Sequence, residues 1–479
     1  MTVDVAIIGS SPNALAAAAR LARANRSVVI LEASEQVGGP LATEELAPGF
    51  LANTGMPAAP LDPELAHLPR LDDSAFEVSR RTTVTRLAST PLTLPEQRLP
   101  AAFEAAVALV RALDRVTPPE LSAAAELSPI AQQLLALDER TVHDVLRLLF
   151  VSVRDFCAEA KLSDAEAAVL AGVATRGRGT GPFAPGSLFG ALRLAAQGDA
   201  VQRSTVRGGV QQLPRRMAEA AMASGCEIRT GTSATVDVEG GVATGVRLAT
   251  GERIAAWAVL SDLDARATFT RLVSPAEIEP EVKRALRSLR YRGTVARIHL
   301  ALRELPRFTG VDDAALRGTL VVAGDLDDQE RAWDAAKRGA LPARPYIELA
   351  IPTLDDPSLA PPGQHVVDVW VQHVPYAFRD RAALLARVLD AVAPHAPGLA
   401  DLVLHHHVAL PHDLEARFGL TEGHLYGGEL SLEQAFLFRP FSGCTGYQTP
   451  IRNLYLCGSA SHPGGYTGRS GWNAAGGLI

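Results

Sequence analysis

The sequence predicts an α/β fold in which a domain of discontinuous segments around a parallel sheet carries an inserted α+β domain, with a mixed sheet and a helical lid. Three observations predict this arrangement. The N-terminus follows the pattern strand, tight turn, helix, strand; the middle of the chain has a hairpin signature; and a short apolar strand precedes a glycine-rich turn near the end. The pieces of the first domain are therefore split along the chain.

Length and composition narrow the classes of protein. The 479 residues, 47% of them hydrophobic, are enough for two interleaved domains. No run of about 18 uncharged apolar residues occurs, and the start lacks a basic n-region, so neither a transmembrane helix nor a secretory signal is expected. The net charge of −7 without a basic stripe argues against nucleic acid. Four scattered cysteines without a C-x-x-C pair indicate reduced thiols in a cytoplasmic protein.

The first unit of the fold is predicted at the N-terminus. Residues 3–8 form a β-branched run, Gly9 follows, and residues 13–24 are rich in alanine and leucine. A second apolar run over 28–31 ends at Glu32. Such continuous apolar strands on either side of a helix are typical of a βαβ unit that opens a parallel sheet buried on both faces.

The inserted region is predicted to begin with helices and to continue with strands. Residues from about 101 to 174 are helical in pattern, and 141–158 carry apolar residues around most of the helix. That stretch is interpreted either as a core helix or as one that faces a lipid-like ligand. Strands of a second sheet are expected at 295–302, 319–322, 346–351 and 365–374, with a helix at 381–392.

The remaining pieces of the first domain follow Gly208-Gly209. A helix is expected over 210–224, and Thr250-Gly251 separates the two strands of the predicted hairpin. Near the end, residues 453–457 form a short apolar strand, followed by a glycine-rich turn and a helix from about Trp472.

The N-terminal turn carries a degenerate dinucleotide fingerprint. The sequence from Gly9 to Ala14 reads G-S-S-P-N-A against the pattern G-x-G-x-x-G/A, so Ser11 replaces the glycine that lets the backbone approach a pyrophosphate. Glu32 lies at the distance expected for a carboxylate that binds a ribose hydroxyl. On these residues alone, a βαβ unit without a nucleotide and a solvated strand-end carboxylate stay open as alternatives.

A double glycine follows the acidic residue. Gly38-Gly39 would let the chain pass close to a cofactor, and its alternative interpretation is an ordinary turn. The double glycine and the turn from Gly9 to Ala14 together indicate a dinucleotide site more specifically than either motif alone.

Segments along nearly the whole chain, in order, resemble the phytoene desaturase-like flavoproteins, including the branch described as pyridine nucleotide-disulfide oxidoreductase domain-containing. The matching segments are Asp4 to Phe50, Arg207-Gly208-Gly209, Cys226 to Gly231, Ser261-Asp262, the stretch from His412 to Gln434, Arg439-Pro440, Thr449-Pro450-Ile451, Asn453 to Gly458 and Ser461 to Gly468.

The resemblance implies a Rossmann-like FAD-binding domain with non-covalent FAD. Its expected segments are 1–70, 200–290 and 425–479, and the substrate-binding domain is expected over 71–199 and 291–424. The positions that correspond to cofactor contacts in the family are Gly9, Ser11, Pro12, Asn13, Ala14, Glu32, Ala33, Gly38, Gly39, Ala234, Gly458, Ser459, Thr467 and Gly468. The chain departs from the family at Ser11, and its flavin-side loop is shorter and carries Tyr466.

Candidate catalytic residues are expected beside the flavin ring. They are His462, Tyr466, Arg469 and Trp472, as groups that position substrate or transfer a proton, and a structural role is the alternative for each.

No metal site is expected. The side chains of His405, His406 and His407 would alternate between the two faces of a strand and could not converge. His299 and His373 are interpreted as strand histidines with satisfied hydrogen bonds.

The resemblance implies an FAD-dependent dehydrogenase or desaturase that removes hydride from a C–C or C–N bond of a largely apolar small molecule. A redox-neutral flavin isomerase and a non-catalytic binding protein with the same fold are the alternatives. Peripheral membrane contact and the oligomeric state stay open.

Overall fold

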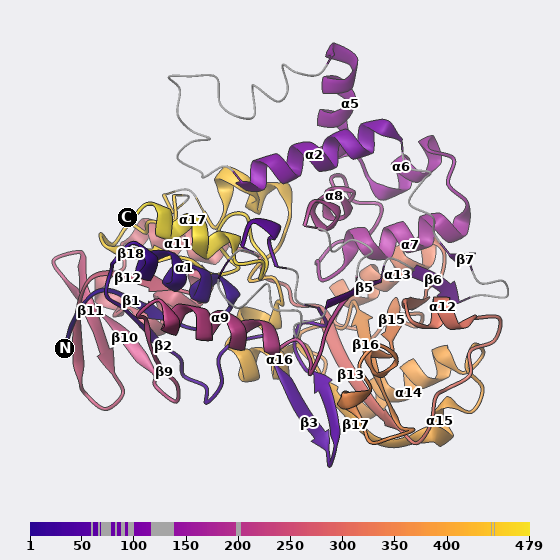
Figure 1. Ribbon diagram of the computed structural model, residues 1–479. Helices are drawn as coiled ribbons and strands as arrows, with labels where there is room; N and C mark the ends of the chain where they lie inside the picture. The colour runs from indigo at the N-terminus through magenta and orange to yellow at the C-terminus, as the bar shows by residue number, and fades with distance from the viewer. Residues whose placement is uncertain are drawn as a thin grey trace.

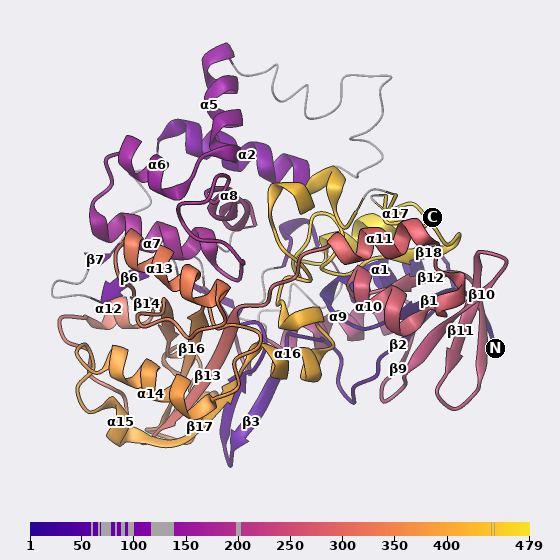
Figure 2. The same cartoon turned by 180° about the vertical axis from the view of Figure 1, so that it is seen from behind.

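The structure, a computed structural model, describes residues 1–58, 61–65, 68, 78–81, 84–87, 92–93, 100–115, 138–197, 203–441, 443–444 and 446–479. Two seven-stranded sheets lie in the two halves of the molecule, and a group of helices lies above the second sheet (Figures 1 and 2). The expected domain boundaries near residues 70 and 200, and part of the expected helical region 101–174, lie outside the described residues.

The first sheet collects strands from both ends and the middle of the chain. Its spatial order is β10-β11-β12-β1-β2-β9, with β18 also paired to β12. The pairs formed by β1, β2, β9, β12 and β18 are parallel, and β10-β11-β12 are antiparallel. The strands are β1 (Thr2–Ile8), β2 (Val28–Leu31), β9 (Glu227–Arg229), β10 (Ala234–Glu239), β11 (Val242–Leu248), β12 (Arg253–Ser261) and β18 (Leu454–Leu456).

Helices cover both faces of this sheet. One face packs against α1 (Pro12–Arg23), α9 (Gln212–Ala223) and α17 (Arg469–Gly476). The opposite face packs against the region of α10 (Ala265–Ala267) and α11 (Pro280–Ser288). Burial on both faces explains why its central strands are continuously apolar, as the sequence predicted.

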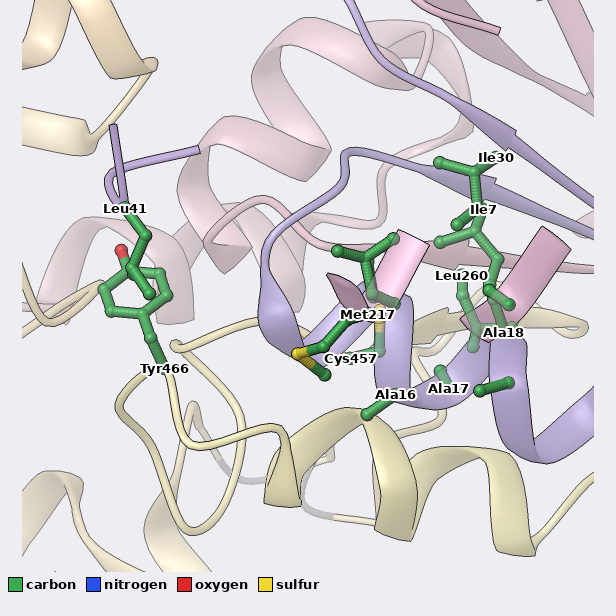
Figure 3. Packing of buried hydrophobic residues seen from close by; sticks show 14 of the residues in the cluster. Ile7, Ala16, Ala17, Ala18, Ile30, Leu41, Met217, Leu260, Cys457 and Tyr466 are labelled. Carbon is green, nitrogen blue, oxygen red and sulfur yellow. The ribbon is translucent and has the colours of Figure 1, made fainter. Parts of the chain in front are cut away.

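Small side chains bring α1 close to the sheet. Ala16, Ala17 and Ala18 lie opposite Ile7 and Leu260 in the core (Figure 3). Because α1 packs closely on the sheet, its N-terminus lies next to the carboxyl ends of the parallel strands. The helix begins with proline, and the Ser11 hydroxyl caps it by accepting from the backbone N–H of Asn13 at 3.3 Å.

The second sheet is mixed, as predicted. Its order is β17-β13-β16-β15-β14-β6-β7, and β14 pairs with β6 in parallel while the other pairs are antiparallel. The strands are β6 (Val84–Leu87), β7 (Leu92–Thr93), β13 (Val295–Leu302), β14 (Thr319–Val322), β15 (Ile347–Ala350), β16 (His365–Gln372) and β17 (Val403–Ala409).

Two antiparallel two-stranded sheets and several helices complete this description. They are β3 (Thr43–Ala47) with β4 (Phe50–Asn53), β5 (Val78–Arg81) with β8 (Arg203–Val206), α12 (Asp313–Leu316), α13 (Leu326–Lys337), α14 (Arg381–Val392), α15 (Leu399–Leu402) and α16 (Pro411–Phe418).

The helical region corrects one expectation. It contains α2 (Ala101–Arg115), α5 (Glu139–Phe150), α6 (Val153–Glu159), α7 (Asp164–Thr175) and α8 (Phe189–Ala196). The single helix predicted over 141–158 is two helices, because Ser152 caps α6 by accepting from the Asp155 N–H at 3.0 Å. Leu146 and Phe150 are exposed, so α5 is not buried all round. In the described part of the chain, no helix combines the length and apolarity that crossing a membrane requires.

Candidate cofactor site and active site

A cavity of about 370 Å³ opens at the carboxyl ends of the parallel strands of the first sheet. This edge is where open α/β sheets bind ligands, since strands β2 and β12 lie on opposite sides of β1 and the chain leaves in two directions. The walls come from the β1–α1 turn, the end of β2, residues 232–234, the end of β12, residues 416–420, Gly427, Ser459 and Tyr466.

The phosphate turn lies where the sequence predicted it. Gly9 and Ser11 line the cavity at the N-terminus of α1. Gly9 has a φ of +99°, and a Cβ there would lie 2.8 Å from the Cβ of Asp262, so the turn needs glycine. Free backbone N–H groups at a helix N-terminus bind anions, which fits a pyrophosphate at this position.

The next three residues of the motif form the first turn of α1 and do not line the cavity. Asn13 is fully buried and links the two ends of the chain. Its Nδ2 donates to the carbonyl oxygen of Gly465 at 2.8 Å, and its Oδ1 accepts from the N–H of Gly468 at 3.0 Å. Pro12 and Ala14 are buried beside it. These residues hold the shape of the turn rather than a wall of the cavity.

Glu32 lies at the end of β2 with its carboxylate on the cavity wall, next to Ala33. The carboxylate accepts from the Ser10 hydroxyl at 2.5 Å and from the Ser34 N–H at 2.8 Å. These contacts fix its orientation, and each oxygen keeps a lone pair for a ribose hydroxyl.

The double glycine packs against the phosphate turn. Gly39 lines the cavity, and Gly38 lies behind it with its N–H donating to the Ser10 carbonyl at 3.0 Å. A Cβ at Gly38 would lie 2.7 Å from the Pro214 ring. Ala234, at the start of β10, lines the cavity, as do residues 232–233 and Leu272.

The C-terminal glycine motif forms the other end of the site. Ser459 and Tyr466 line the cavity, whereas Gly458, Thr467 and Gly468 are buried behind it. Gly458 passes so close to the Asp262 carbonyl that a side chain would collide with it. Gly468 caps the N-terminus of α17 with a φ of +86°.

The four candidate catalytic side chains do not converge on one point. His462 bonds the Leu113 carbonyl oxygen through Nε2 at 3.0 Å. Arg469 donates to the carboxylates of Asp62 and Glu64 at 2.6–2.8 Å. The Arg20 guanidinium lies 4.8 Å from the centre of the Trp472 ring.

Tyr466 is the one of the four that lines the cavity. It is buried with Leu41 at its side (Figure 3), and its hydroxyl lies near Ser459 without a hydrogen bond of normal geometry among the described residues. Burial raises the pKa of this phenol well above its ordinary value, so the hydroxyl stays protonated and can donate a hydrogen bond at neutral pH. A buried hydroxyl without a partner fits a site that a bound molecule completes.

Asp262 is a cavity residue that the sequence analysis missed. It directly follows β12, and its carboxylate accepts from the Ser11 backbone N–H at 2.7 Å and from the Ser11 hydroxyl at 2.6 Å. The available signal was its place after an apolar strand, because carboxyl ends of neighbouring parallel strands meet at the same edge.

The histidines of the second sheet lie apart from this cavity. In β17, His407 pairs with His299 of β13, and the two rings stack at 5.8 Å between centroids. His299 Nε2 bonds the Asn53 carbonyl oxygen at 3.0 Å. His373 directly follows β16, and the expectation of a strand histidine with satisfied hydrogen bonds is wrong for it, because its buried Nδ1 has no hydrogen-bond partner among the described residues. Burial lowers the pKa of His373 to about 3, so that imidazole is neutral. The described residues contain no group of three or more side chains suited to hold a metal ion.

Comparison with known proteins identifies matches over the whole chain. The family model for flavin containing amine oxidoreductase matches residues 15–479. Pyridine nucleotide-disulfide oxidoreductase domain-containing protein 2 of Rattus norvegicus is 30% identical, over 98% of this chain and 92% of its own. One of the subunits of limonene dehydrogenase from Castellaniella defragrans is 24% identical over 98% and 93%. The zeta-carotene-forming phytoene desaturase of Myxococcus xanthus is 25% identical over 60% and 53%.

Solved structures share the fold. Putrescine oxidase bound to putrescine superimposes with a TM-score of 0.62 at 18% identity, over 99% of this chain and 97% of its own. An oxidoreductase from Methanosarcina mazei gives 0.62 at 16% identity, over 98% of both chains.

Proposed function

The chain belongs to the family of flavin-containing amine oxidoreductases and is an FAD-dependent oxidoreductase; from this premise we propose that it is a dehydrogenase or desaturase that removes hydride from a C–C bond of a largely apolar small molecule. The bound flavin supplies the hydride chemistry. The chain supplies the binding of the cofactor, the orientation of the substrate and the exclusion of water.

The names of the relatives support an apolar substrate. One relative that matches along 98% of this chain belongs to a limonene dehydrogenase, and several that match over 54–60% are phytoene desaturases. The names of these relatives point to hydrocarbon substrates and C–C bonds rather than to amines.

The surroundings of Tyr466 are the observation that carries the proposal. This residue belongs to an apolar cluster that also contains Leu41, Met56, Val295 and Leu430. Apolar packing on this side of Tyr466 favours a hydrocarbon beside it, because these four side chains offer no counter-ion to a charged ammonium group.

The polar candidates nearby have their charges or ring nitrogens engaged by the protein. The Arg469 guanidinium is held by two carboxylates, and the His462 ring bonds a backbone carbonyl. We therefore propose that Tyr466 positions the substrate and that Arg469, His462 and Trp472 support the loop around it.

The cofactor would be held by the cavity described above. We propose that Glu32 binds the adenosine ribose, that the N-terminus of α1 with Gly9 and Ser11 binds the pyrophosphate, and that Ser459 contacts the ribityl side. The glycines and Asn13 behind the walls would maintain this geometry.

Anaerobic reduction of the bound flavin tests the substrate class. The purified holoenzyme would be mixed with a panel of terpenoid hydrocarbons and a matched panel of alkyl amines, and flavin absorbance would be followed. Bleaching by hydrocarbons, with a product that has lost two hydrogen atoms, supports the proposal. Bleaching by amines alone would overturn it in favour of C–N oxidation.

The same mixtures distinguish a dehydrogenase from a redox-neutral isomerase. A redox-neutral isomerase would convert a hydrocarbon into a product of unchanged mass, with the flavin oxidised at the end of the reaction. A cytoplasmic location and a peripheral contact with membranes stay proposals that this experiment does not address.

A further inference from the structure

A buried carboxyl group faces the position where the cofactor's phosphates would lie. Asp262 lines the cavity, and both of its oxygens are tied to Ser11, one to the backbone N–H at 2.7 Å and one to the hydroxyl at 2.6 Å. Gly9 packs on its Cβ and Gly458 on its backbone. The side chain therefore has little room to turn away from the phosphate turn.

The charges around Asp262 are mostly of its own sign. Glu32 on β2 and Asp264 beyond β12 line the same cavity, and the neutral groups of Cys457 and Tyr466 face it from the C-terminal segment.

The two arginines that line the cavity form ion pairs with carboxylates other than Asp262. Arg271 pairs with Glu415 at 3.6 Å, and Arg417 pairs with Glu44 at 2.6 Å. Among the described residues, no lysine or arginine forms an ion pair with Asp262. Burial, followed by the charge of Glu32, raises the pKa of Asp262 to about 7, although the two hydrogen bonds from Ser11 act in the opposite direction.

A pyrophosphate at the N-terminus of α1 would bring further negative charge to this carboxyl. Like charges in a poorly solvated site disfavour joint ionisation, so one of the two groups takes up a proton. The diphosphate diester has no group that titrates near neutrality, which leaves Asp262 as the group that changes.

We propose that Asp262 and Ser11 form a proton-coupled contact to FAD, in which Asp262 is neutral in the holoenzyme and cofactor binding takes up one proton from solvent. Neutral Asp262 donates from Oδ1 to the Ser11 Oγ. The Ser11 hydroxyl is then free to donate into the cavity, toward a phosphate oxygen. The serine that replaces the fingerprint glycine is thus a functional part of this site.

The pH dependence of FAD affinity tests the proposal. Holoenzyme is diluted at pH values from about 6 to about 8.5, and the rise in flavin fluorescence on release gives the Kd. Asp262 is protonated below its pKa, so affinity is fully present on the acid side and is lost as pH rises. We expect the Kd to increase toward tenfold per pH unit above about 7.

Two variants and one control test whether Asp262 and Ser11 cause the pH dependence of FAD affinity. In Asp262→Asn the Kd should be nearly independent of pH. In Ser11→Gly the pH dependence should persist, with binding weaker by about two- to tenfold at acid pH because one hydrogen bond is lost. Asp334→Asn, an exposed carboxylate on α13 paired with Lys337, should behave as the wild type.

Each outcome decides the matter. A wild-type Kd that does not change with pH overturns the proposal without reference to any variant. An unchanged pH dependence in Asp262→Asn, in a variant that retains the wild-type circular dichroism spectrum, assigns the proton to another group and overturns it as well.

Discussion

Glu32 is the residue that we propose binds the adenosine ribose. Its carboxylate is oriented by Ser10 and Ser34 and lines the cavity. We expect Glu32→Gln to weaken FAD binding by about 10- to 100-fold, because a hydrogen bond to a charged acceptor contributes about 1.5–3 kcal/mol. Flavin fluorescence on dilution measures the change in Kd.

A neighbouring glutamate provides the matched control. Glu35 is exposed in the same segment and does not line the cavity. Glu35→Gln should leave the Kd unchanged. Equal losses in the two variants would mean that general electrostatics, rather than a contact to the ribose, controls the affinity.

Substitution of Tyr466 tests whether its hydroxyl acts in the reaction or stabilises the fold. Its hydroxyl lies near Ser459 but makes no hydrogen bond of normal geometry within the described structure, so Tyr466→Phe removes no strong hydrogen bond of the protein. We expect the free energy of unfolding to stay unchanged or to rise by about 1 kcal/mol, since an unsatisfied buried hydroxyl is unfavourable. Substrate-dependent bleaching of the flavin should slow severalfold if the hydroxyl positions the substrate.

The control is a buried tyrosine that does make a hydrogen bond. The Tyr447 hydroxyl donates to the His462 carbonyl at 3.0 Å. Tyr447→Phe should lower the free energy of unfolding by about 1 kcal/mol. A comparable loss in Tyr466→Phe would contradict the assignment of a free hydroxyl in the cavity.

Local motifs explain which site residues the sequence could predict. Gly9, Ser11 and Glu32 lie within one βαβ unit, so their spacing alone indicates a common site. Asp262 lies 251 positions from Ser11, and the two meet only because β12 pairs with β1. Sequence periodicity carries no information on which strands become neighbours, and that is why this carboxyl was missed.

At the scale of elements, Asn13 connects the first helix to the last. Its amide bonds the Gly465 carbonyl and the Gly468 N–H, in the loop that precedes α17. We expect Asn13→Ala to lower the free energy of unfolding by about 2–4 kcal/mol, because two buried backbone groups lose their partner. Urea unfolding followed by circular dichroism gives this value, and flavin should be released more readily from the folded variant.

The outcome that would contradict this role is a variant as stable as the wild type. Thr235→Ala, at an exposed position of β10, is a suitable control because its hydroxyl donates only a long hydrogen bond within the described structure, to the Arg247 carbonyl at 3.5 Å. It should change the free energy of unfolding by no more than a few tenths of a kcal/mol.

Elements with a strong local pattern were predicted well. The strands β13 and β16 are mostly apolar and rich in β-branched residues, with isolated polar side chains, and both form within a few residues of the expected bounds. The break between α5 and α6 was missed because Val151 continues the apolar pattern, while the cap that interrupts it is a single serine. A cap inside an apolar run is a weak signal against the periodicity around it.

At the scale of the whole molecule, the sequence predicted which segments of the chain form each sheet. It did not predict how the two halves contact each other. The three N-terminal, central and C-terminal pieces assemble into the first sheet because each supplies strands that need burial on both faces. Apolar residues of the second sheet such as Val295 and Trp370 pack against the core of this half. Polar side chains join the two halves as well, and no sequence motif predicted them.

A buried ionic cluster forms part of that contact. Arg297 of β13 pairs with Asp368 of β16, and its guanidinium donates to the Asn53 carbonyl at 3.2 Å at the end of β4. His299 bonds the same carbonyl. The side chains of Arg297 and Asp368 are 1% and 2% exposed, so neither charge has water as a substitute partner.

Removing one charge from this cluster should therefore destabilise the whole chain rather than one element. We expect Asp368→Asn to lower the free energy of unfolding by about 3–5 kcal/mol, because Arg297 is left buried without its counter-ion. The double variant Arg297→Met with Asp368→Leu should recover most of this loss, since apolar packing replaces an ion pair at little net cost.

Urea unfolding measured by flavin fluorescence and by circular dichroism should show both signals changing at the same denaturant concentration, because the cluster connects the sheet to the segment that leads into the cofactor domain. A loss in Asp368→Asn no larger than that in the exposed-pair variant Asp334→Asn would show that the cluster contributes nothing to the union of the two halves.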